Sequence, residues 1–535
     1  MRDLRVAVIG AGMAGIASVI KLREAGIDDV TVFEKADEVG GTWRENTYPG
    51  IACDVPSHLY SYSFAPNADW SHTFSPGDEI QAYFQRVARN EGVYERVRFG
   101  EEVTSLDYGG GRWTLATASG YRDDFDVVIA ATGVLHHPNV PDLPGLGSFA
   151  GAAFHSARWD HDVPLDGRRV GVIGTGSSAV QITGALVDRV DHLDLFQRTP
   201  QWIMPVDNTP YDEAQRRAFH DDPALMAQAR EGLGRAFADH FANAVIDADS
   251  PAMALIEEAC RAHLDTVAVP ELRDRLRPDY RAACKRLIAS GDFYDAIQRP
   301  NASLVTERIE RIEPRGVRTA DGELHELDVL VLATGFRVDR FLRPTEARGR
   351  DGIRLDDVWA ERPSAHLALT VPGFPNLFLL NGPNGPVGNF SLIDVAELQL
   401  GYTIQLLNLL RAGAESVEPT VEAAEAFEAA RVEATRGTVW VTGCRSWYLD
   451  DRGIPAAWPW SIDHFRAVMQ APDLSQYRIA GRSAPTPDRT GAASCVRPAT
   501  TFRTVLGPEA PGTGSSCQRQ DPSAGRAPAR PRCCA

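Results

Sequence analysis

The sequence has few cysteines, and no two of them are paired in the way that dithiol redox enzymes require. Eight cysteines occur among 535 residues, none forms a CxxC motif, and four lie close to the C-terminus. So few in the body of the chain indicate a reducing compartment rather than a disulfide framework. The cysteines of the body are Cys53, Cys260, Cys284 and Cys444.

Long apolar runs and an excess of positive charge are also absent. No uninterrupted apolar run reaches the roughly 18 residues of a membrane-spanning helix. Basic residues number 55 against 72 acidic ones, a formal charge of -17 that repels nucleic acid and acidic membrane surfaces. With 44% hydrophobic residues, the chain can bury a sizeable core. We expect a cytoplasmic protein without nucleic-acid or membrane partners, either a monomer or a weak homo-oligomer.

Two segments share the order strand, glycine-rich turn, helix, strand. Residues 4–34 and residues 169–198 each carry an apolar run, a glycine turn, a helical stretch and a second apolar run. Each is a βαβ unit, so the sequence predicts two dinucleotide sites. The turn residues are Gly10, Gly12 and Gly15 in the first unit and Gly174, Thr175, Gly176, Ser177, Ser178 and Ala179 in the second.

A glycine-rich turn in this position allows the backbone to approach a pyrophosphate. The N-terminus of the following helix then supplies amide hydrogens and a partial positive charge. Ala179 takes the place of the last glycine, a replacement that the motif tolerates. The alternative, a βαβ unit whose glycines only allow tight packing, stays open at this point.

The last strands of the two units end in opposite charges. Counted from the first glycine of each unit, Glu34 lies at 34 − 10 = 24 and Arg198 at 198 − 174 = 24. A carboxylate accepts hydrogen bonds from ribose hydroxyls but repels a 2′-phosphate, whereas a guanidinium binds that phosphate. We therefore expect FAD in the first site and NADPH in the second, with Thr199 adding a hydroxyl. The alternative for Arg198 is a solvated surface charge.

The remaining sequence indicates an α/β fold with two Rossmann-like dinucleotide-binding domains. Apolar runs at 127–131 and 329–333 each lead into a Thr-Gly turn, which resembles the domain crossover of flavoproteins with two dinucleotide sites. Helical spacing without strand signals predicts a helical insertion, and too few apolar residues near the C-terminus predict a disordered tail. The expected parts are the FAD domain 1–140, a linker 141–168, the NADP domain 169–326 with the insertion 207–283, the second part of the FAD domain 327–480, and the tail 481–535.

Two cofactor sites fit a disulfide reductase, an amine or sulfur oxygenase, or a ketone oxygenase, and the missing CxxC argues against the reductase. The linker narrows the choice. Its segment Phe149-x-Gly151-x-x-x-His155-x-x-x-Trp159-Asp160 is similar at every fixed position to FxGxxxHxxxW(P/D), the fingerprint of type I Baeyer–Villiger monooxygenases. Flavin-containing monooxygenases that oxidise nitrogen or sulfur carry a related version, usually without the tryptophan and the residue after it.

A second stretch, residues 40–54, resembles the pattern (A/G)GxWxxxx(F/Y)P(G/M)xxxD of the same family. The resemblance spans about residues 6–477 and implies that Asp54 and Arg286 lie near the flavin, with Lys285 reaching toward the NADPH phosphate. From the residues alone, Lys285 and Arg286 fit an exposed basic pair equally well. The resemblance also assigns to cofactor binding Met13, Ala14, Thr42, Trp43, Tyr60, Val103 and Gln181.

The resemblance implies an NADPH- and FAD-dependent monooxygenase that converts a ketone and O2 to an ester or lactone through a C4a-peroxyflavin. In this reading the flavin supplies the oxygen chemistry. Arg286 would stabilise the anionic oxygen species in a water-poor cleft, and Asp54 would position its guanidinium. The expected partners are a small-molecule ketone and O2.

Several alternatives stay open at the level of the sequence. His155 and Trp159 fit a structural role, with the histidine bonded to a carbonyl, as well as a chemical one. The competing functions are a flavin monooxygenase that oxidises nitrogen or sulfur and a flavin-binding scaffold without turnover. We expect the helical insertion and the loops 384–390 and 440–460 to line the substrate pocket. The aromatic stretch 456–460 suggests an apolar lid, although packing against the core explains it equally well. The identity of the ketone lies beyond the sequence.

Overall fold

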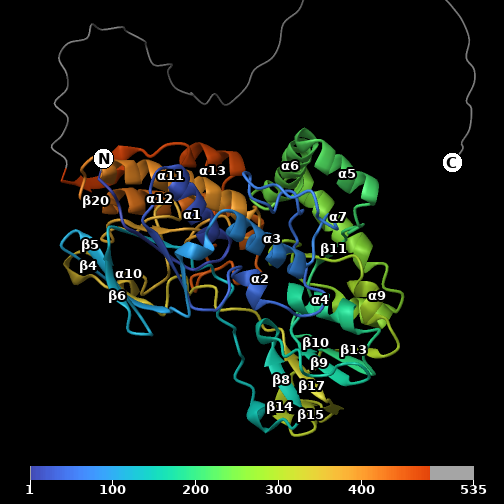
Figure 1. Ribbon diagram of the computed structural model, residues 1–535. Coiled ribbons are helices and arrows are strands. Elements are labelled where there is room, and N and C mark those ends of the chain that lie inside the picture. The colour runs from blue at the N-terminus through green and yellow to red at the C-terminus, as the bar shows by residue number, and fades with distance from the viewer. Residues whose placement is uncertain (1, 482–535) are drawn as a thin grey trace, which may run out of the picture. The chain divides into compact units, whose positions relative to one another are not determined.

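The computed structural model describes residues 2–481, and both predicted βαβ units are present (Figure 1). The chain folds as an α/β protein with two parallel sheets, and each unit contributes two strands to one of them. The predicted tail, 481–535, lies almost wholly outside the described residues. The first unit consists of β1 (Val6–Ile9), α1 (Met13–Glu24) and β2 (Val30–Glu34), and the second of β9 (Arg169–Ile173), α4 (Ser177–Leu186) and β10 (His192–Phe196).

The first sheet has five parallel strands in the order β19-β7-β1-β2-β3. Its central strand, β1, aligns Val6 with Val30 of β2 and with Val127 of β7. All four residues of β1 are buried, as expected for a parallel strand covered on both faces. The other strands are β7 (Val127–Ala130), β3 (Val97–Phe99) and β19 (Leu377–Leu379).

The second sheet, also of five parallel strands, has the order β13-β10-β9-β17-β8, and its strands lie together at the lower end of Figure 1. Two of its strands come from segments that the sequence analysis placed outside the NADP domain. They are β8 (Ala152–His155), from the expected linker, and β17 (Val329–Leu332), from the segment 327–480. The remaining strand is β13 (Ala302–Val305).

Smaller sheets flank the two large ones. A four-stranded sheet has the order β18-β4-β5-β6, a three-stranded sheet has the order β14-β15-β16, and two pairs are β11-β12 and β20-β21. Their bounds are β4 (Val103–Gly109), β5 (Arg112–Thr117), β6 (Arg122–Phe125), β18 (Glu346–Arg348), β14 (Ile309–Glu313), β15 (Gly316–Thr319), β16 (Leu324–Glu326), β11 (Ile203–Met204), β12 (Ile288–Ala289), β20 (Ser416–Pro419) and β21 (Tyr477–Ala480).

Helices cover the sheets and build the expected insertion. None of the described helices is both long and apolar enough to cross a membrane. Outside the insertion the further helices are α2 (Thr42–Glu45), α3 (Gly77–Asn90), α9 (Phe293–Ile297), α10 (Leu355–Val358), α11 (Leu392–Arg411), α12 (Val421–Ala434) and α13 (Ile462–Met469). The insertion contains α5 (Glu213–Asp221), α6 (Pro223–Phe237), a π-helical turn (Ala238–Ala242), α7 (Pro251–Leu264) and α8 (Pro270–Leu276).

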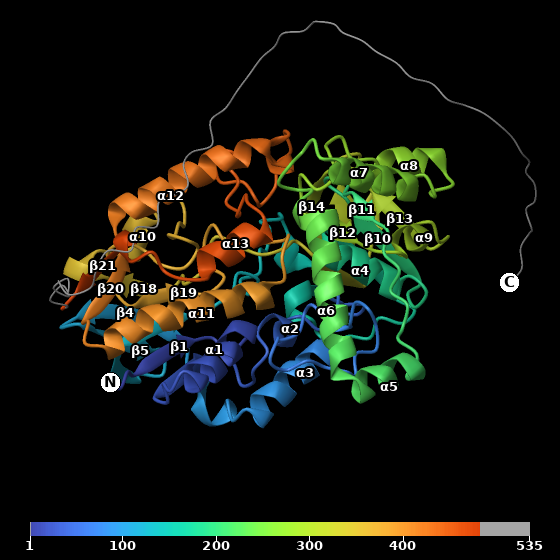
Figure 2. The ribbon, with the colours of Figure 1, turned by 90° about the horizontal axis from the view of Figure 1, so that it is seen from above.

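The helices of the insertion begin at residues that favour a helix start. The side chain of Asp212 accepts from the backbone N–H of Gln215 and completes a capping box. Asp222 and Ser250 cap α6 and α7, and each is followed by a proline at the first helical position, where the missing N–H costs nothing. Figure 2 shows α6 as a long helix running from α5 toward α7.

Arg230 joins the insertion to the first domain. From α6, its Nη1 donates to the carbonyl oxygens of His58, at 3.1 Å, and Ser61, at 2.5 Å. Its Nη2 forms an ion pair with Asp394 on α11. One guanidinium therefore ties three segments that are far apart in the sequence, and it sets the insertion beside the 58–61 segment.

The structure corrects the expectation for the cysteines. Cys284 and Cys444 form a disulfide bond with a Cα–Cα distance of 6.2 Å, whereas Cys53 and Cys260 are free and buried. The sequence could not reveal this pair because 160 positions separate its members, and only folding brings the end of the insertion against the loop that contains Cys444. A reducing compartment is therefore no longer the inference that these cysteines support.

Candidate functional site

Both glycine turns open into one cavity of about 1670 Å³. The cavity follows the carboxyl ends of β1 and β9, where ligands bind in open parallel sheets. Of the cofactor-binding residues predicted from the sequence, all but Gly15 and Ala179 line its wall. The turns of the two units, the strand ends and the Arg286 segment therefore belong to one site.

The N-termini of α1 and α4 are open to a ligand. Their N-cap residues, Gly12 and Gly176, provide no side chain to bind the free N–H groups of the first turn. A Cβ on Gly176 would meet no atom within 4 Å, so the space beside it is free. By contrast, a Cβ on Gly15 would lie 1.9 Å from the carbonyl oxygen of Gly10. Gly15 therefore packs against the backbone of the turn and does not line the cavity.

The two strand ends present the opposite charges that the sequence placed there. The carboxylate of Glu34 accepts from the backbone N–H groups of Ala11, at 2.8 Å, and Ala36, at 3.0 Å. Arg198 is exposed and forms no ion pair with any described residue. The Glu34 carboxylate is thus fixed in place, whereas the Arg198 guanidinium is available to a ligand.

Lys285 adds a second cation near Arg198. Burial lowers the pKa of Lys285, Asp279 opposes this shift, and the charge of Arg198 adds to it. The Lys285 ammonium lies 4.3 Å from the centre of the Tyr280 ring. An anion bound beside Lys285 and Arg198 would relieve the repulsion between these two cations.

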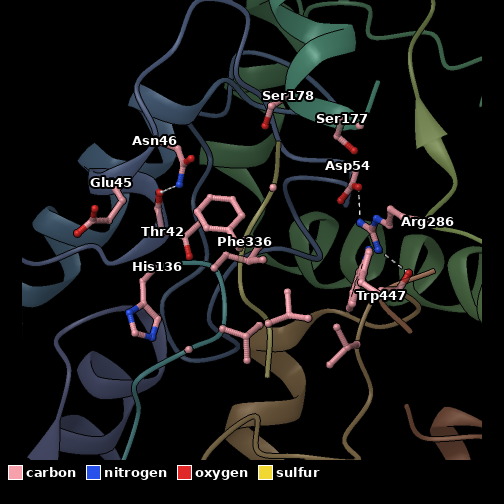
Figure 3. Close-up of a pocket in the computed structure, with 18 of the residues that line it drawn as sticks. Thr42, Glu45, Asn46, Asp54, His136, Ser177, Ser178, Arg286, Phe336 and Trp447 are labelled. Carbon is pink, nitrogen blue, oxygen red and sulfur yellow. Dashed lines mark hydrogen bonds and ion pairs between the residues drawn. The ribbon is translucent and has the colours of Figure 1, made fainter. Parts of the chain in front are cut away.

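Arg286 and Asp54 both lie in the wall of the cavity, where their side chains form an ion pair (Figure 3). The guanidinium donates through Nη2 to Asp54 and through Nη1 to the carbonyl oxygen of Gly388, at 2.7 Å. Burial alone would lower the pKa of Arg286, but Asp54 and the Tyr448 hydroxyl outweigh it, so the guanidinium stays charged. The side chain keeps 28% of its surface exposed. Its remaining N–H groups can therefore serve a ligand.

Three buried polar atoms that line the cavity have no hydrogen-bond partner among the described residues. They are Oδ1 of Asn381, Nε2 of His136 and Nε of Arg44. Such atoms are costly unless a ligand or water satisfies them, so they fit a site that binds a polar molecule. Burial and then Lys35 lower the pKa of His136 to about 3, so its imidazole is neutral at pH 7.

These three residues are not among those predicted from the sequence, although their positions in the chain carry two signals. Asn381 follows β19 and His136 follows β7 with its Thr-Gly turn, so both lie just beyond the carboxyl end of a parallel strand in the first sheet. Ligands of open parallel sheets bind at that edge. Arg44 lies inside the motif 40–54 but at a variable position of the pattern.

A further part of the cavity wall comes from the insertion and from two late loops, as the sequence predicted. Most of these side chains are apolar, with His240, Arg445 and Ser446 as the exceptions. The insertion contributes Ala236, Phe237, His240, Phe241 and Ile256, the loop 384–390 contributes Val387, Gly388 and Phe390, and the loop 440–460 contributes Arg445, Ser446 and Trp447.

The fingerprint residues do not line the cavity. Gly151 lies in the turn before β8, where a Cβ would come within 2.2 Å of the carbonyl oxygen of Asp328, so only glycine fits. Trp159 packs edge-on against Phe154, with ring centres 5.0 Å apart. Phe149, Gly151, His155, Trp159 and Asp160 therefore lie on the connection between the sheets, outside the wall of the cavity.

His155 is bonded on both ring nitrogens. Nδ1 accepts from the backbone N–H of Ala157, at 3.1 Å, so Nε2 carries the proton and donates to the carbonyl oxygen of Gly335, at 3.0 Å. Gly335 belongs to the Thr-Gly turn after β17. Burial lowers the pKa of His155. The histidine thus joins the linker to the domain crossover, which is the structural alternative that the sequence left open.

Known proteins resemble this chain over most of its length. The model of the flavin-binding monooxygenase-like family matches residues 3–217. The chain is 48% identical over 467 residues to an uncharacterised monooxygenase of Mycobacterium tuberculosis, covering 87% of this chain and 94% of that protein. It is 40% identical over 503 residues to a Baeyer–Villiger monooxygenase of Streptomyces coelicolor, covering 91% and 94%. The crystal structure of cyclohexanone monooxygenase from Rhodococcus sp. Phi1 bound to NADP+ has a TM-score of 0.80 at 31% identity and covers 90% of this chain and 99% of that one.

Proposed function

Because this chain belongs to the family of flavin-binding monooxygenases that includes Baeyer–Villiger monooxygenases, we propose that it inserts one oxygen atom of O2 beside a ketone carbonyl. FAD and NADPH are the cofactors of this proposal, and an ester or lactone is the product. The observation that carries it is the charged pair of Arg286 and Asp54 in the wall of a cavity that reaches both glycine turns.

The residues of the first unit suit FAD. The open N-terminus of α1 would bind its pyrophosphate through backbone N–H groups, and Glu34 would accept from ribose hydroxyls. The unpartnered Oδ1 of Asn381 and Nε2 of His136 offer further hydrogen bonds along the same wall. A carboxylate at the strand end disfavours a 2′-phosphate in this site, which supports FAD over NADPH here.

The residues of the second unit suit NADPH. The open N-terminus of α4 would bind the pyrophosphate beside Gly176, where no side chain takes up the space. Arg198 and Lys285 would bind the 2′-phosphate, whose negative charge relieves the repulsion between the two cations. The hydroxyl of Thr175 is already used, because it donates to the carbonyl oxygen of Thr199 at 2.8 Å.

When bound, FAD and NADPH supply the reducing electrons and the activation of O2. The protein itself contributes the side chains that surround the reacting centre. The Arg286 guanidinium is permanently charged and keeps unused N–H groups, so it can stabilise negative charge that develops on the carbonyl oxygen of the substrate. Asp54 orients the guanidinium, and the apolar side chains of the insertion and late loops would exclude water.

A panel of linear, cyclic and aryl ketones, with one aryl sulfide beside them, tests the proposal. Purified protein loaded with FAD should consume NADPH and O2 and give an ester or lactone that carries one labelled oxygen atom from isotopically labelled O2. Formation of a sulfoxide in addition is compatible with this activity. A protein that oxidises the sulfide but gives no ester from any ketone would be a nitrogen- or sulfur-oxidising monooxygenase, and a protein that holds FAD but consumes no NADPH would be a scaffold.

A further inference from the structure

Arg286 and Tyr448 meet over Gly388. A Cβ on Gly388 would lie 2.1 Å from the hydroxyl oxygen of Tyr448 and 2.9 Å from Nη1 of Arg286. The φ angle of Gly388 is +86°, and its carbonyl oxygen accepts a hydrogen bond from the same Nη1. The guanidinium is therefore enclosed by Asp54 on one side and by Gly388 and Tyr448 on the other.

The position of Tyr448 is well defined by its neighbours. The residue is 4% exposed, and its ring packs against Trp440 and Trp447, with ring centres 5.6 Å and 4.2 Å away. Its backbone N–H donates to the hydroxyl of Ser446, at 3.3 Å, and its carbonyl oxygen accepts from Ala456, at 2.7 Å. Ring and backbone both hold the hydroxyl at the guanidinium.

The disulfide bond joins the two segments that carry this contact. Cys284 precedes Arg286 by two residues, and Cys444 precedes Tyr448 by four. The guanidinium follows the insertion and the hydroxyl lies on the loop 440–460, so the two groups lie on segments that are covalently linked. This link limits how far the two groups can separate.

We propose that Tyr448 is a positioning residue for Arg286, whose hydroxyl oxygen accepts a hydrogen bond from the guanidinium and fixes the direction of its unused N–H groups. Arginine only donates, so the phenolic oxygen is the acceptor. Tyr448 does not line the cavity, whereas Arg445, Ser446 and Trp447 of the same loop do. It therefore acts through Arg286. The inference rests on the role proposed above for Arg286.

The need for such a residue follows from the length of the arginine side chain. The side chain has many rotamers, and a contact to a single carboxylate leaves the guanidinium free to turn about that contact. A third fixed partner removes this freedom. Burial raises the pKa of Tyr448, so its hydroxyl stays protonated at neutral pH and adds no charge beside the guanidinium.

The test compares Tyr448→Phe with a matched control, Tyr477→Phe, in the protein loaded with FAD. Tyr477 is also buried and also loses a hydroxyl contact, because its oxygen lies 2.9 Å from the hydroxyl oxygen of Tyr402, but it does not contact Arg286. The first readout is the rate at which phenylglyoxal modifies Arg286, mapped by mass spectrometry of the peptide that contains it. The second is the yield of ester per NADPH consumed, and the third is the rate of flavin reduction by NADPH.

We expect Tyr448→Phe to speed the modification of Arg286 several-fold and to lower the ester yield per NADPH about tenfold, the value of one charge-assisted hydrogen bond. Flavin reduction should stay within a factor of about two, as the control also does. Gly388→Ala should speed the modification likewise, because its methyl group would displace the hydroxyl. An unchanged modification rate in Tyr448→Phe overturns the proposal, and so does an unchanged ester yield.

The two proposals can fail separately. If the wild-type protein gives no ester from any ketone, the proposed function fails. The modification rate of Arg286 then decides alone whether Tyr448 holds the guanidinium, since that reaction needs no substrate.

Discussion

Cys284 and Cys444 are bonded to each other, so a covalent link joins the end of the helical insertion to the loop that lines the cavity. A bond that closes a loop of this size restricts the unfolded chain strongly, and typical disulfides contribute about 2–4 kcal/mol to the free energy of unfolding. We expect Cys444→Ser, or reduction by dithiothreitol, to lower that free energy by this amount.

Denaturant unfolding with and without reductant measures the effect. The Cys444→Ser variant is its own control, because its unfolding curve should no longer respond to dithiothreitol. Alkylation of the native protein without reductant should leave both cysteines unlabelled. Labelling of both under those conditions would show that the bond does not form in the purified protein.

Gly176 and Gly15 should respond oppositely to the same substitution. A methyl group on Gly176 meets no protein atom, so Gly176→Ala should keep the melting temperature of the wild type. The methyl group would occupy the space expected for the NADPH pyrophosphate, and the affinity for NADP+ should fall at least about tenfold. Gly15→Ala places a methyl group against the Gly10 carbonyl and should destabilise the fold.

Calorimetric titration with NADP+ and thermal unfolding separate these two effects. Weak NADP+ binding by a Gly176→Ala variant that is also unstable would mean that Gly176 serves packing alone.

Arg198→Ala should abolish the preference for NADPH over NADH. The guanidinium is free of protein partners among the described residues, and loss of a hydrogen-bonded charge costs about 1.5–3 kcal/mol, or roughly a 10- to 100-fold rise in the Kd for NADPH. The Kd for NADH should stay the same. Arg189→Ala, which removes an exposed arginine paired with Asp166, is the control. An unchanged ratio of the two Kd values in Arg198→Ala would place the phosphate elsewhere.

Acid should destabilise the protein through His58. Burial, followed by the charge of Arg230, lowers the pKa of His58 to about 4 from an ordinary value of 6.5. Between these values the unfolded chain binds a proton that the folded chain does not, so stability present above pH 6.5 is lost as the pH falls toward 4. The loss from this residue is at most about 3 kcal/mol.

Urea unfolding at a series of pH values measures the slope of the free energy of unfolding against pH. His58 packs against Tyr211 and Phe219, so His58→Phe should keep the packing and flatten the slope. His240→Gln, at an exposed position, should keep the slope of the wild type. Equal slopes in all three proteins would assign the acid sensitivity to other groups.

Short-range sequence patterns predicted the two dinucleotide-binding units. The glycines, the apolar runs and the charges at Glu34 and Arg198 all lie within about thirty residues of one another in each unit, and the order of elements in such a unit follows from backbone geometry. The structure contains both units at the expected residues, and their turns open into one cavity.

Contacts between distant segments were beyond the sequence. The disulfide bond, the bond from His155 to Gly335 and the meeting of Tyr448 with Arg286 each join parts of the chain that only the tertiary fold brings together. Tyr448 lies in the loop 440–460, which was expected to line the pocket, but nothing in the sequence of this loop indicates which side chain faces Arg286.

Stopped-flow kinetics of Arg286→Ala test the central claim most directly, since they measure flavin reduction by NADPH and ester formation in the same protein. The charged guanidinium is assigned to the oxygen-transfer step alone, so reduction should proceed at nearly the wild-type rate while ester formation falls by about 10²- to 10³-fold. Equal loss of both rates, or ester formation at the wild-type rate, would contradict the role given to Arg286.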